Sequence, residues 1–300
     1  MANIIETRGL LKRYGDVTAV NDITLDIEEG SFFGVIGPNG AGKTTLLEII
    51  EGIREPDAGT AKVLGLDTWP RNRQLLPQIG VQFQSSAFFE RLSVTEQLTI
   101  FADLYGTPHR RVAEMLELVG LTDKADTRTE DLSGGQARRL SIACALVHDP
   151  QVVFLDEPTT GLDPQSRRNL WDLLSKINDD GRTVVLTTHY MDEAERLCDT
   201  IAVIDRGSVL ANDSPSSLIA ALDAPYRIHI ERDAIEPGTV ASMDGVESTA
   251  IDDDTLIITT KDPAPVLTAL AGLDALAGLR IRGATLEDVF LTLTGREYRP

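Results

Sequence analysis

The chain has 300 residues, of which 42% are hydrophobic and 25% are charged, and its formal net charge is −19. This composition is typical of a globular protein with a sizeable core, and the acidic balance disfavours binding to nucleic acid. The longest apolar runs, such as residues 142–147, are far shorter than the ~18 to 20 residues that cross a bilayer. The first residues lack the features of a secretion signal. We therefore expect a cytosolic location.

Residues 4–10 and 17–27 alternate apolar and polar side chains around the turn YGD, which predicts a half-exposed antiparallel hairpin. Short apolar runs that are typical of strands buried on both faces of a parallel sheet follow at residues 31–37, 152–156, 183–188 and 201–205. Helices should connect these strands. Residues 165–178 carry apolar side chains at helical spacing, and another helix is expected after His189.

The stretch from about residue 86 to residue 150 contains several helical patterns. Ser93 and Glu96 predict a capping box at the start of a helix that ends at Gly106. A second apolar stripe ends at Gly120, and a third helix begins in the segment LSGGQARRL. Together these patterns predict a helical insertion in an α/β domain.

The pattern changes again after about residue 220. Residues 226–231, 255–260 and 279–283 have the alternation of strands, and residues 265–273 and 286–293 have helical spacing. We therefore expect two domains, an α/β domain over residues 1–220 and a small α+β domain over residues 221–300.

Neither of the two cysteines, Cys144 and Cys198, has a cysteine near it in the sequence. Both occur in stretches that resemble buried helix faces. We expect buried thiols rather than a disulfide or a metal site.

The segment GPNGAGKTT matches the pattern G-x-x-x-x-G-K-[ST] directly between a buried strand and a helix. Glycines let the backbone wind closely around phosphates, while inward N–H groups and the helix N-terminus attract the anion. We expect Lys43 to contact the outer phosphates and Thr44 to offer its hydroxyl to Mg²⁺. The predicted nucleoside triphosphate site also includes Gly37, Pro38, Asn39, Gly40, Ala41, Gly42 and Thr45.

The segment VVFLDEP places two carboxylates at the carboxyl end of a buried strand. Ligands of parallel sheets bind at this edge, so Asp156 is predicted to hold Mg²⁺ through water. Glu157 follows at once and is predicted to orient or deprotonate the attacking water. Taken alone, such a pair fits a helix cap or a loop equally well, but the phosphate loop favours the catalytic role.

A second glycine-containing turn begins at Ser133 and continues through Gly134 and Gly135. Its hydroxyl and backbone N–H groups are suited to face the side of a γ-phosphate that the first loop leaves uncovered. The alternative is a helix N-cap that contacts no ligand.

The segments GPNGAGKTT, LSGGQ and VVFLDEP, in this order, resemble those of the nucleotide-binding subunits of ATP-binding cassette (ABC) transporters, over roughly residues 4–220. The resemblance implies the P-loop NTPase fold of the ABC-type ATPase core, with an antiparallel β subdomain. It also implies a homodimer in which Ser133, Gly134, Gly135 and Gln136 of one subunit close over the ATP held by the other. Separate integral-membrane permease subunits would hold the dimer at the cytoplasmic face of the cell membrane.

Single residues acquire roles from the same resemblance. Tyr14 matches the aromatic residue that stacks on adenine, although without the resemblance it fits the hairpin core. Gln84 matches the glutamine that links Mg²⁺ and the attacking water to the helical subdomain, with Gln82 as the alternative. His189 matches the histidine that reaches the γ-phosphate, and Asp163 matches a segment that contacts the opposite subunit.

Two further segments bear on the partner and on the subfamily. Phe88 and Phe89 occur where family members receive a cytoplasmic permease helix, or they pack under the helical subdomain. Residues 284–297 resemble the tail of bacterial export ATPases of the daunorubicin type, although the same apolar stripe also fits a packing helix.

We therefore expect an ATP hydrolase that powers a separate ABC-2 type exporter of a drug, an antibiotic or a lipid-like small molecule. The alternative is a soluble ABC ATPase that acts on ribosomes or nucleic acid, but tandem cassettes, coiled coils and basic arms are missing from the sequence. A regulatory role for the tail domain is a third interpretation. The transported substrate would be recognised by the permease.

Overall fold

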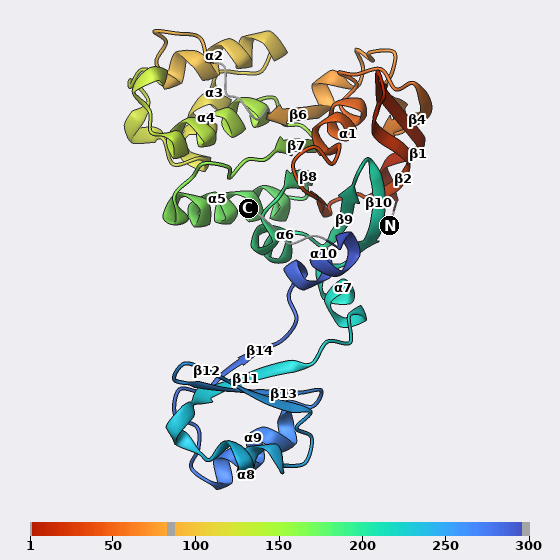
Figure 1. Ribbon diagram of the computed structural model, residues 1–300. Coiled ribbons are helices and arrows are strands. Elements are labelled where there is room, and N and C mark those ends of the chain that lie inside the picture. The colour runs from red at the N-terminus through yellow and green to blue at the C-terminus, as the bar shows by residue number, and fades with distance from the viewer. Residues whose placement is uncertain (1, 83–87, 296–300) are drawn as a thin grey trace. The chain divides into compact units, whose positions relative to one another are not determined.

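The computed structural model describes residues 2–82 and 88–295 of the chain (Figure 1). These residues divide into two compact units, one that ends at Pro215 and one that begins at Ser216. No helix of the described residues is both long and apolar enough to cross a membrane.

The first unit begins with the predicted hairpin. Strands β1 (Asn3–Tyr14) and β2 (Val17–Glu28) pair antiparallel, and β4 (Ala58–Val63) and β5 (Leu66–Asp67) extend the sheet in the order β2-β1-β4-β5. Alternate side chains of β2 are buried, as the amphipathic pattern predicts. The antiparallel β subdomain is therefore confirmed, with two strands that its sequence pattern does not reveal.

A six-stranded sheet in the order β10-β9-β3-β8-β7-β6 forms the centre of the unit. Its strands are β3 (Phe32–Ile36), β6 (Ile79–Gln82), β7 (Val152–Asp156), β8 (Thr183–Thr188), β9 (Thr200–Asp205) and β10 (Ser208–Asp213). All pairs are parallel except β9 with β10. Every residue of β3, β7 and β8 is buried, which confirms the short apolar runs as central strands.

Helices connect these strands and form the helical insertion. They are α1 (Lys43–Ile50), α2 (Val94–Tyr105), α3 (Arg110–Leu118), α4 (Gly134–Leu146), α5 (Pro164–Asp179) and α6 (Met191–Leu197), with 3₁₀ turns at Leu76–Gln78, Thr122–Lys124 and Thr129–Asp131. The capping box of Ser93 and Glu96 is present, and Gly106 ends α2 with a φ of 66°. Helices α2, α3 and α4 contact one another, as expected for one helical insertion.

One apolar core joins the hairpin sheet, α1 and one face of the central sheet, with Leu46 and Ile49 of α1 fully buried in it. This packing holds α1 against the hairpin sheet and against β7 and β8 of the central sheet.

The second unit contains its own sheet and core. Strands β11 (Tyr226–Glu231), β12 (Ser248–Asp252), β13 (Thr255–Thr260) and β14 (Arg280–Arg282) pair antiparallel in the order β12-β13-β11-β14. Helices α8 (Pro237–Ala241) and α9 (Pro263–Gly272) cover one face of this sheet (Figure 1). The remaining elements are α7 (Pro215–Ala221), the 3₁₀ turn Arg232–Ala234 and α10 (Leu286–Thr294). This is the extra α+β region that the alternating strands predict.

Candidate nucleotide site

The phosphate loop lies between β3 and α1, in the place that its motif predicts. Gly42 has a φ of +103°, and a Cβ on it would lie 2.0 Å from the carbonyl oxygen of Ala19. A Cβ on Gly37 would lie 2.2 Å from the carbonyl oxygen of Ile204. Both positions therefore accept only glycine, because the loop packs directly on the neighbouring backbone.

Lys43 is the charged centre of the loop. Its side chain is only 5% exposed, and its Nζ donates to the carbonyl oxygens of Gly37 at 2.9 Å and Pro38 at 3.3 Å. The same ammonium lies 3.3 Å from Oε1 of Glu157. Loop and carboxylate are thus held together by one buried cation.

Thr44 and Asp156 form the predicted magnesium pair. The Thr44 hydroxyl donates to Oδ2 of Asp156 at 3.1 Å, and Thr187 donates to the other carboxylate oxygen, Oδ1. Hydroxyl and carboxylate oxygens are hard donors of the kind that Mg²⁺ prefers, so this pair fits the ion. The described residues contain no cluster of three or more His, Cys, Asp and Glu side chains suited to a metal, so the fit involves only this pair.

Glu157 combines unusual backbone geometry with burial. Its φ is +44°, a region that a non-glycine residue rarely adopts and that is often found at functional sites. Oε2 lies 3.3 Å from Nδ1 of His189 and accepts from the Thr160 hydroxyl at 3.1 Å. Burial alone would raise the pKa of Glu157, but the neighbouring Lys43 and His189 lower it below its ordinary value. The carboxylate is therefore ionised at neutral pH.

Thr187 is a site residue that the sequence analysis missed. Its hydroxyl accepts from the backbone N–H of Glu157 at 3.0 Å while it donates to Asp156. Thr187 thus orients both carboxylates from the end of the adjacent strand, β8. The sequence signal that could have identified Thr187 is its position near the end of TVVLTT, the strand that pairs with VVFLD in the parallel sheet.

A cavity of about 370 Å³ opens over the loop and is lined by eight of the predicted residues: Tyr14, Asn39, Gly40, Gly42, Lys43, Thr44, Thr45 and Glu157. Ala19, which the sequence analysis did not select, also lines it. Tyr14 is 42% exposed, so its assignment to the hairpin core is wrong. The guanidinium of Arg54 lies 5.4 Å from the centre of the Tyr14 ring and steadies the ring from one side. Ala41 is buried and does not line the cavity.

The second glycine-containing turn forms the start of α4. The Ser133 hydroxyl accepts from the N–H of Gln136 at 3.3 Å, and Oε1 of Gln136 accepts from the N–H of Ser133 at 2.9 Å. This reciprocal capping box confirms the N-cap as a structural role. Among the described residues that line the cavity over the phosphate loop, none comes from this turn, which also includes Gly134 and Gly135.

The remaining predicted residues are Asp163, Phe89, Gln82 and Gln84. Asp163 caps α5 by accepting from the N–H groups of Gln165 and Ser166, both at 3.0 Å. Phe89 is 54% exposed. Strand β6 is described through Gln82, which is buried, whereas Gln84 lies outside the described residues.

Both cysteines are free and buried, as predicted. Burial raises the pKa of Cys144 to about 12, and that of Cys198 also rises well above its ordinary value. Neither thiol is therefore an ionised nucleophile near neutral pH.

Comparison with known proteins decides the family. The family model described as ABC transporter matches residues 20–160. The chain is 40% identical to the Nod factor export ATP-binding protein I of Cupriavidus metallidurans, over 100% of both chains. It is 42% identical to the protein of the same name from Paraburkholderia xenovorans, over 98% of each chain. The chain belongs to the ABC transporter family, as an ATP-binding subunit.

Solved structures of ABC proteins agree with this fold. The cbiO1 protein of Clostridium perfringens, part of the ABC transporter complex cbiONQ, is 30% identical with a TM-score of 0.68 over 73% of this chain and 92% of that chain. A dimeric post-hydrolysis state of the ATP-binding cassette MJ0796, bound to ADP and phosphate, is 28% identical with a TM-score of 0.63 over 70% of this chain and 98% of that chain. The ABC subunit described here is thus an ABC-type ATPase with an additional C-terminal α+β region.

Proposed function

We propose that this ABC ATPase works as a homodimer that powers an ABC-2 type exporter with separate membrane permease subunits. The observation that carries the proposal is the similarity to export ATP-binding proteins along the whole chain, including the C-terminal unit. The names of these relatives support the export of a small molecule, and they favour export over action on ribosomes or nucleic acid. The permease would hold the dimer at the cytoplasmic face of the membrane and would select the molecule.

The residues of the site divide the work of hydrolysis. The N–H groups of the phosphate loop and the ammonium of Lys43 bind the phosphates of ATP. Glu157, ionised and fixed by Thr160 and Lys43, is in position to accept a proton from the attacking water. His189, beside Glu157, is positioned to donate to the γ-phosphate.

Thr44 and Asp156 would hold Mg²⁺, directly and through water. When bound, the ion neutralises charge on the β- and γ-phosphates. We also propose that Gln84, or the alternative Gln82, joins the ion's surroundings to the helical subdomain.

The turn from Ser133 to Gln136 provides the argument for a dimer. It presents a hydroxyl and the N-terminus of α4 but does not line the cavity over its own phosphate loop. We propose that it covers the ATP of a second copy, with Asp163 at the same interface. The dimeric cassette with bound ADP and phosphate supports this arrangement.

The proposed activity is tested by ATP hydrolysis with the purified full-length chain. Wild type should hydrolyse ATP only when Mg²⁺ is present. Glu157→Gln should lose at least about 100-fold in rate, whereas Glu195→Gln, which changes an exposed carboxylate on α6, should retain it. Normal hydrolysis by Glu157→Gln would contradict the role of Glu157.

The proposed partner is tested in the genome. The neighbouring reading frame should encode a membrane protein with about six apolar helices. An ATPase gene without a permease gene beside it would weaken the exporter proposal and leave the ATPase activity untouched.

A further inference from the structure

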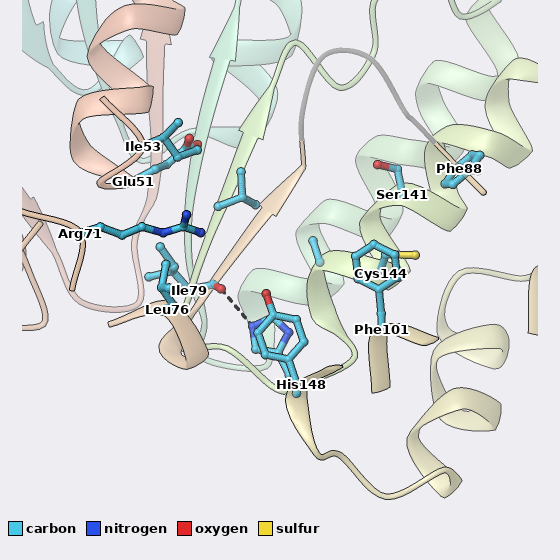
Figure 2. A pocket seen from close by; sticks show the side chains of 13 residues that line it. Glu51, Ile53, Arg71, Leu76, Ile79, Phe88, Phe101, Ser141, Cys144 and His148 are labelled. Atoms are coloured by element: carbon cyan, nitrogen blue, oxygen red, sulfur yellow. Dashed lines mark hydrogen bonds between the residues drawn. The ribbon is translucent and has the colours of Figure 1, made fainter. Parts of the chain in front are cut away.

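Besides Glu157, the described residues contain two buried glutamates, Glu51 and Glu193. Glu51 ends α1 and is 4% exposed, unlike the nearby Glu55, which is exposed. Figure 2 shows Glu51 beside Ile53 at the wall of a cavity, and no hydrogen bond or ion pair of the described residues reaches its carboxyl group. Burial raises the pKa of Glu51 to about 8. Among the described residues, Glu51 therefore holds no other group in place through its carboxyl oxygens.

The carboxylate of Glu193 is, by contrast, surrounded by hydrogen-bond donors. Glu193 lies on α6 and is 0% exposed. Its Oε1 accepts from the indole N–H of Trp171 at 3.0 Å, and its Oε2 accepts from the hydroxyl of Thr159 at 3.1 Å. The Thr188 hydroxyl also donates to this carboxylate. Donors from α5, from the turn after β7 and from the end of β8 therefore meet at one buried group.

This arrangement has a cost in stability. Burial raises the pKa of Glu193 above its ordinary value, although the three donors favour the charged form. None of the described Lys, Arg and His side chains forms an ion pair with Glu193 within 4.0 Å. An apolar side chain of similar size would avoid the cost of burying an unpaired acid. The groups that Glu193 binds indicate what the acid provides in its place.

The two threonines that Glu193 binds lie beside the proposed hydrolytic pair. Thr159 follows Glu157 by two residues, and Thr188 directly precedes His189. Oε2 of Glu157 and Nδ1 of His189 are 3.3 Å apart. Glu193 thus connects the two backbone segments that carry this pair.

The backbone of Glu157 depends on such connections. Its φ of +44° is a strained conformation, which persists only where the surrounding structure fixes it. The Thr187 hydroxyl accepts from the N–H of Glu157 at 3.0 Å, and the Thr160 hydroxyl donates to its Oε2 at 3.1 Å. The hydrogen bond from Thr159 to Glu193 anchors the same turn to α6.

We propose that Glu193 is a positioning residue for ATP hydrolysis, which keeps Glu157 and His189 at the separation that the reaction needs. This inference rests on the proposed function of that pair. Glu193 acts on the first through Thr159 and on the second through Thr188. It thereby fixes the turn that carries the carboxylate relative to the end of β8.

The chemistry of the donors predicts which substitutions preserve the connection. The Trp171 N–H can only donate, so it needs an oxygen as its partner. A threonine hydroxyl both donates and accepts, so Thr159 can accept from the amide N–H of a glutamine. Glu193→Gln therefore preserves the connection, whereas Glu193→Ala removes it.

Steady-state ATP hydrolysis and ATP binding by the full-length chain test the proposal. Glu193→Ala should lower kcat at least about tenfold while the Kd for ATP changes less than about twofold, because the phosphate loop is unaltered. Glu193→Gln should keep at least about half of the wild-type kcat. Glu195→Ala, at an exposed carboxylate on the same helix, should behave like wild type.

A milder variant keeps the test decisive if Glu193→Ala does not fold. Thr159→Val removes one hydroxyl and should lower kcat at least about threefold with unchanged ATP binding. The double variant should have the kcat of Glu193→Ala, because Thr159 then has no carboxylate to bind. Met115→Ala, in the core of α3, lowers stability without touching these contacts and should keep the wild-type kcat.

Three results would overturn the proposal: a wild-type kcat in Thr159→Val, equal losses in Glu193→Gln and Glu193→Ala, or independent losses that multiply in the double variant. A fall of kcat in Met115→Ala as large as that in Glu193→Ala would assign the effect to stability and overturn it too. Glu157→Gln tests the proposed function separately. A wild-type kcat in Thr159→Val beside an inactive Glu157→Gln would refute the role of Glu193 alone.

Discussion

Lys43, Asp156 and Glu157 meet in one small volume although more than a hundred residues separate the lysine from the acids. Their motifs and the parallel sheet predict this meeting, because the carboxyl ends of parallel strands share one edge. Thr187 and Glu51 could not be predicted in the same way. The first belongs to no phosphate motif, and the burial of the second depends on how the end of α1 packs against distant elements.

The raised pKa of Glu51 predicts how stability changes with pH. Between about pH 5 and pH 8 the folded chain keeps a proton that the unfolded chain has lost, so the free energy of unfolding should fall as pH rises. The total fall is about 3 to 5 kcal/mol. Glu51→Gln should remove this fall and should therefore be more stable than wild type at pH 8.5.

Urea unfolding at several pH values measures this effect. Both tryptophans, Trp69 and Trp171, lie in the first unit, so their fluorescence reports on that unit alone. Glu55→Gln is the matched control and should behave like wild type. Parallel stability curves for wild type and Glu51→Gln would show that Glu51 is ionised in the folded chain near neutral pH.

Strands and helices with a regular apolar and polar pattern could be predicted from the sequence. Strands that form because an adjacent strand pairs with them could not. The hairpin of β1 and β2, the buried strands and the capped helix α2 each carry a clear pattern. Strand β4 has only two buried side chains and contains Gly59, and β12 is almost entirely exposed. Both are strands because an adjacent strand pairs with them.

The structure predicts that the phosphate loop does not tolerate a side chain at Gly42. Gly42→Ala would force an unfavourable φ and a clash with the backbone of Ala19. We expect a loss of at least about 2 kcal/mol in stability and the loss of ATP binding. Gly238→Ala, in the second unit, is the control, because a Cβ there meets nothing within 4 Å. Isothermal titration with ATP and thermal melting measure both effects, and normal ATP binding by Gly42→Ala would contradict the described loop.

Among the described residues, the phosphate loop and the turn that begins at Ser133 do not line one common cavity. The sequence predicts both turns, whereas the proposal that a second copy unites them comes from the family resemblance. Ser133 already caps its own helix, so its hydroxyl has a structural use in the single chain. Only a measurement on the dimer can distinguish this capping role of Ser133 from its proposed role at the ATP of a second copy.

The Ser133→Arg variant allows such a measurement. We expect the variant to lose at least about 100-fold in ATP turnover, because arginine replaces the hydroxyl that would face the γ-phosphate of the second copy. ATP affinity of the single chain should persist. Equilibrium binding of a fluorescent ATP analogue checks this, and equal loss of binding and turnover would assign both turns to one pocket.

Mixing two inactive variants sharpens the test. A dimer of Ser133→Arg with Glu157→Gln contains one site in which both the carboxylate and the serine turn are intact. The mixture should therefore recover up to roughly a quarter of the wild-type rate, since half of randomly formed dimers are mixed. If each chain hydrolyses ATP alone, mixing restores nothing.

The mass of Glu157→Gln in the presence of ATP and Mg²⁺ is the decisive quantity. Light scattering on the purified variant should give twice the 32.6 kDa of a single chain, and removal of ATP should return the mass to that of one chain. A mass of 32.6 kDa with ATP fully bound would contradict the shared site.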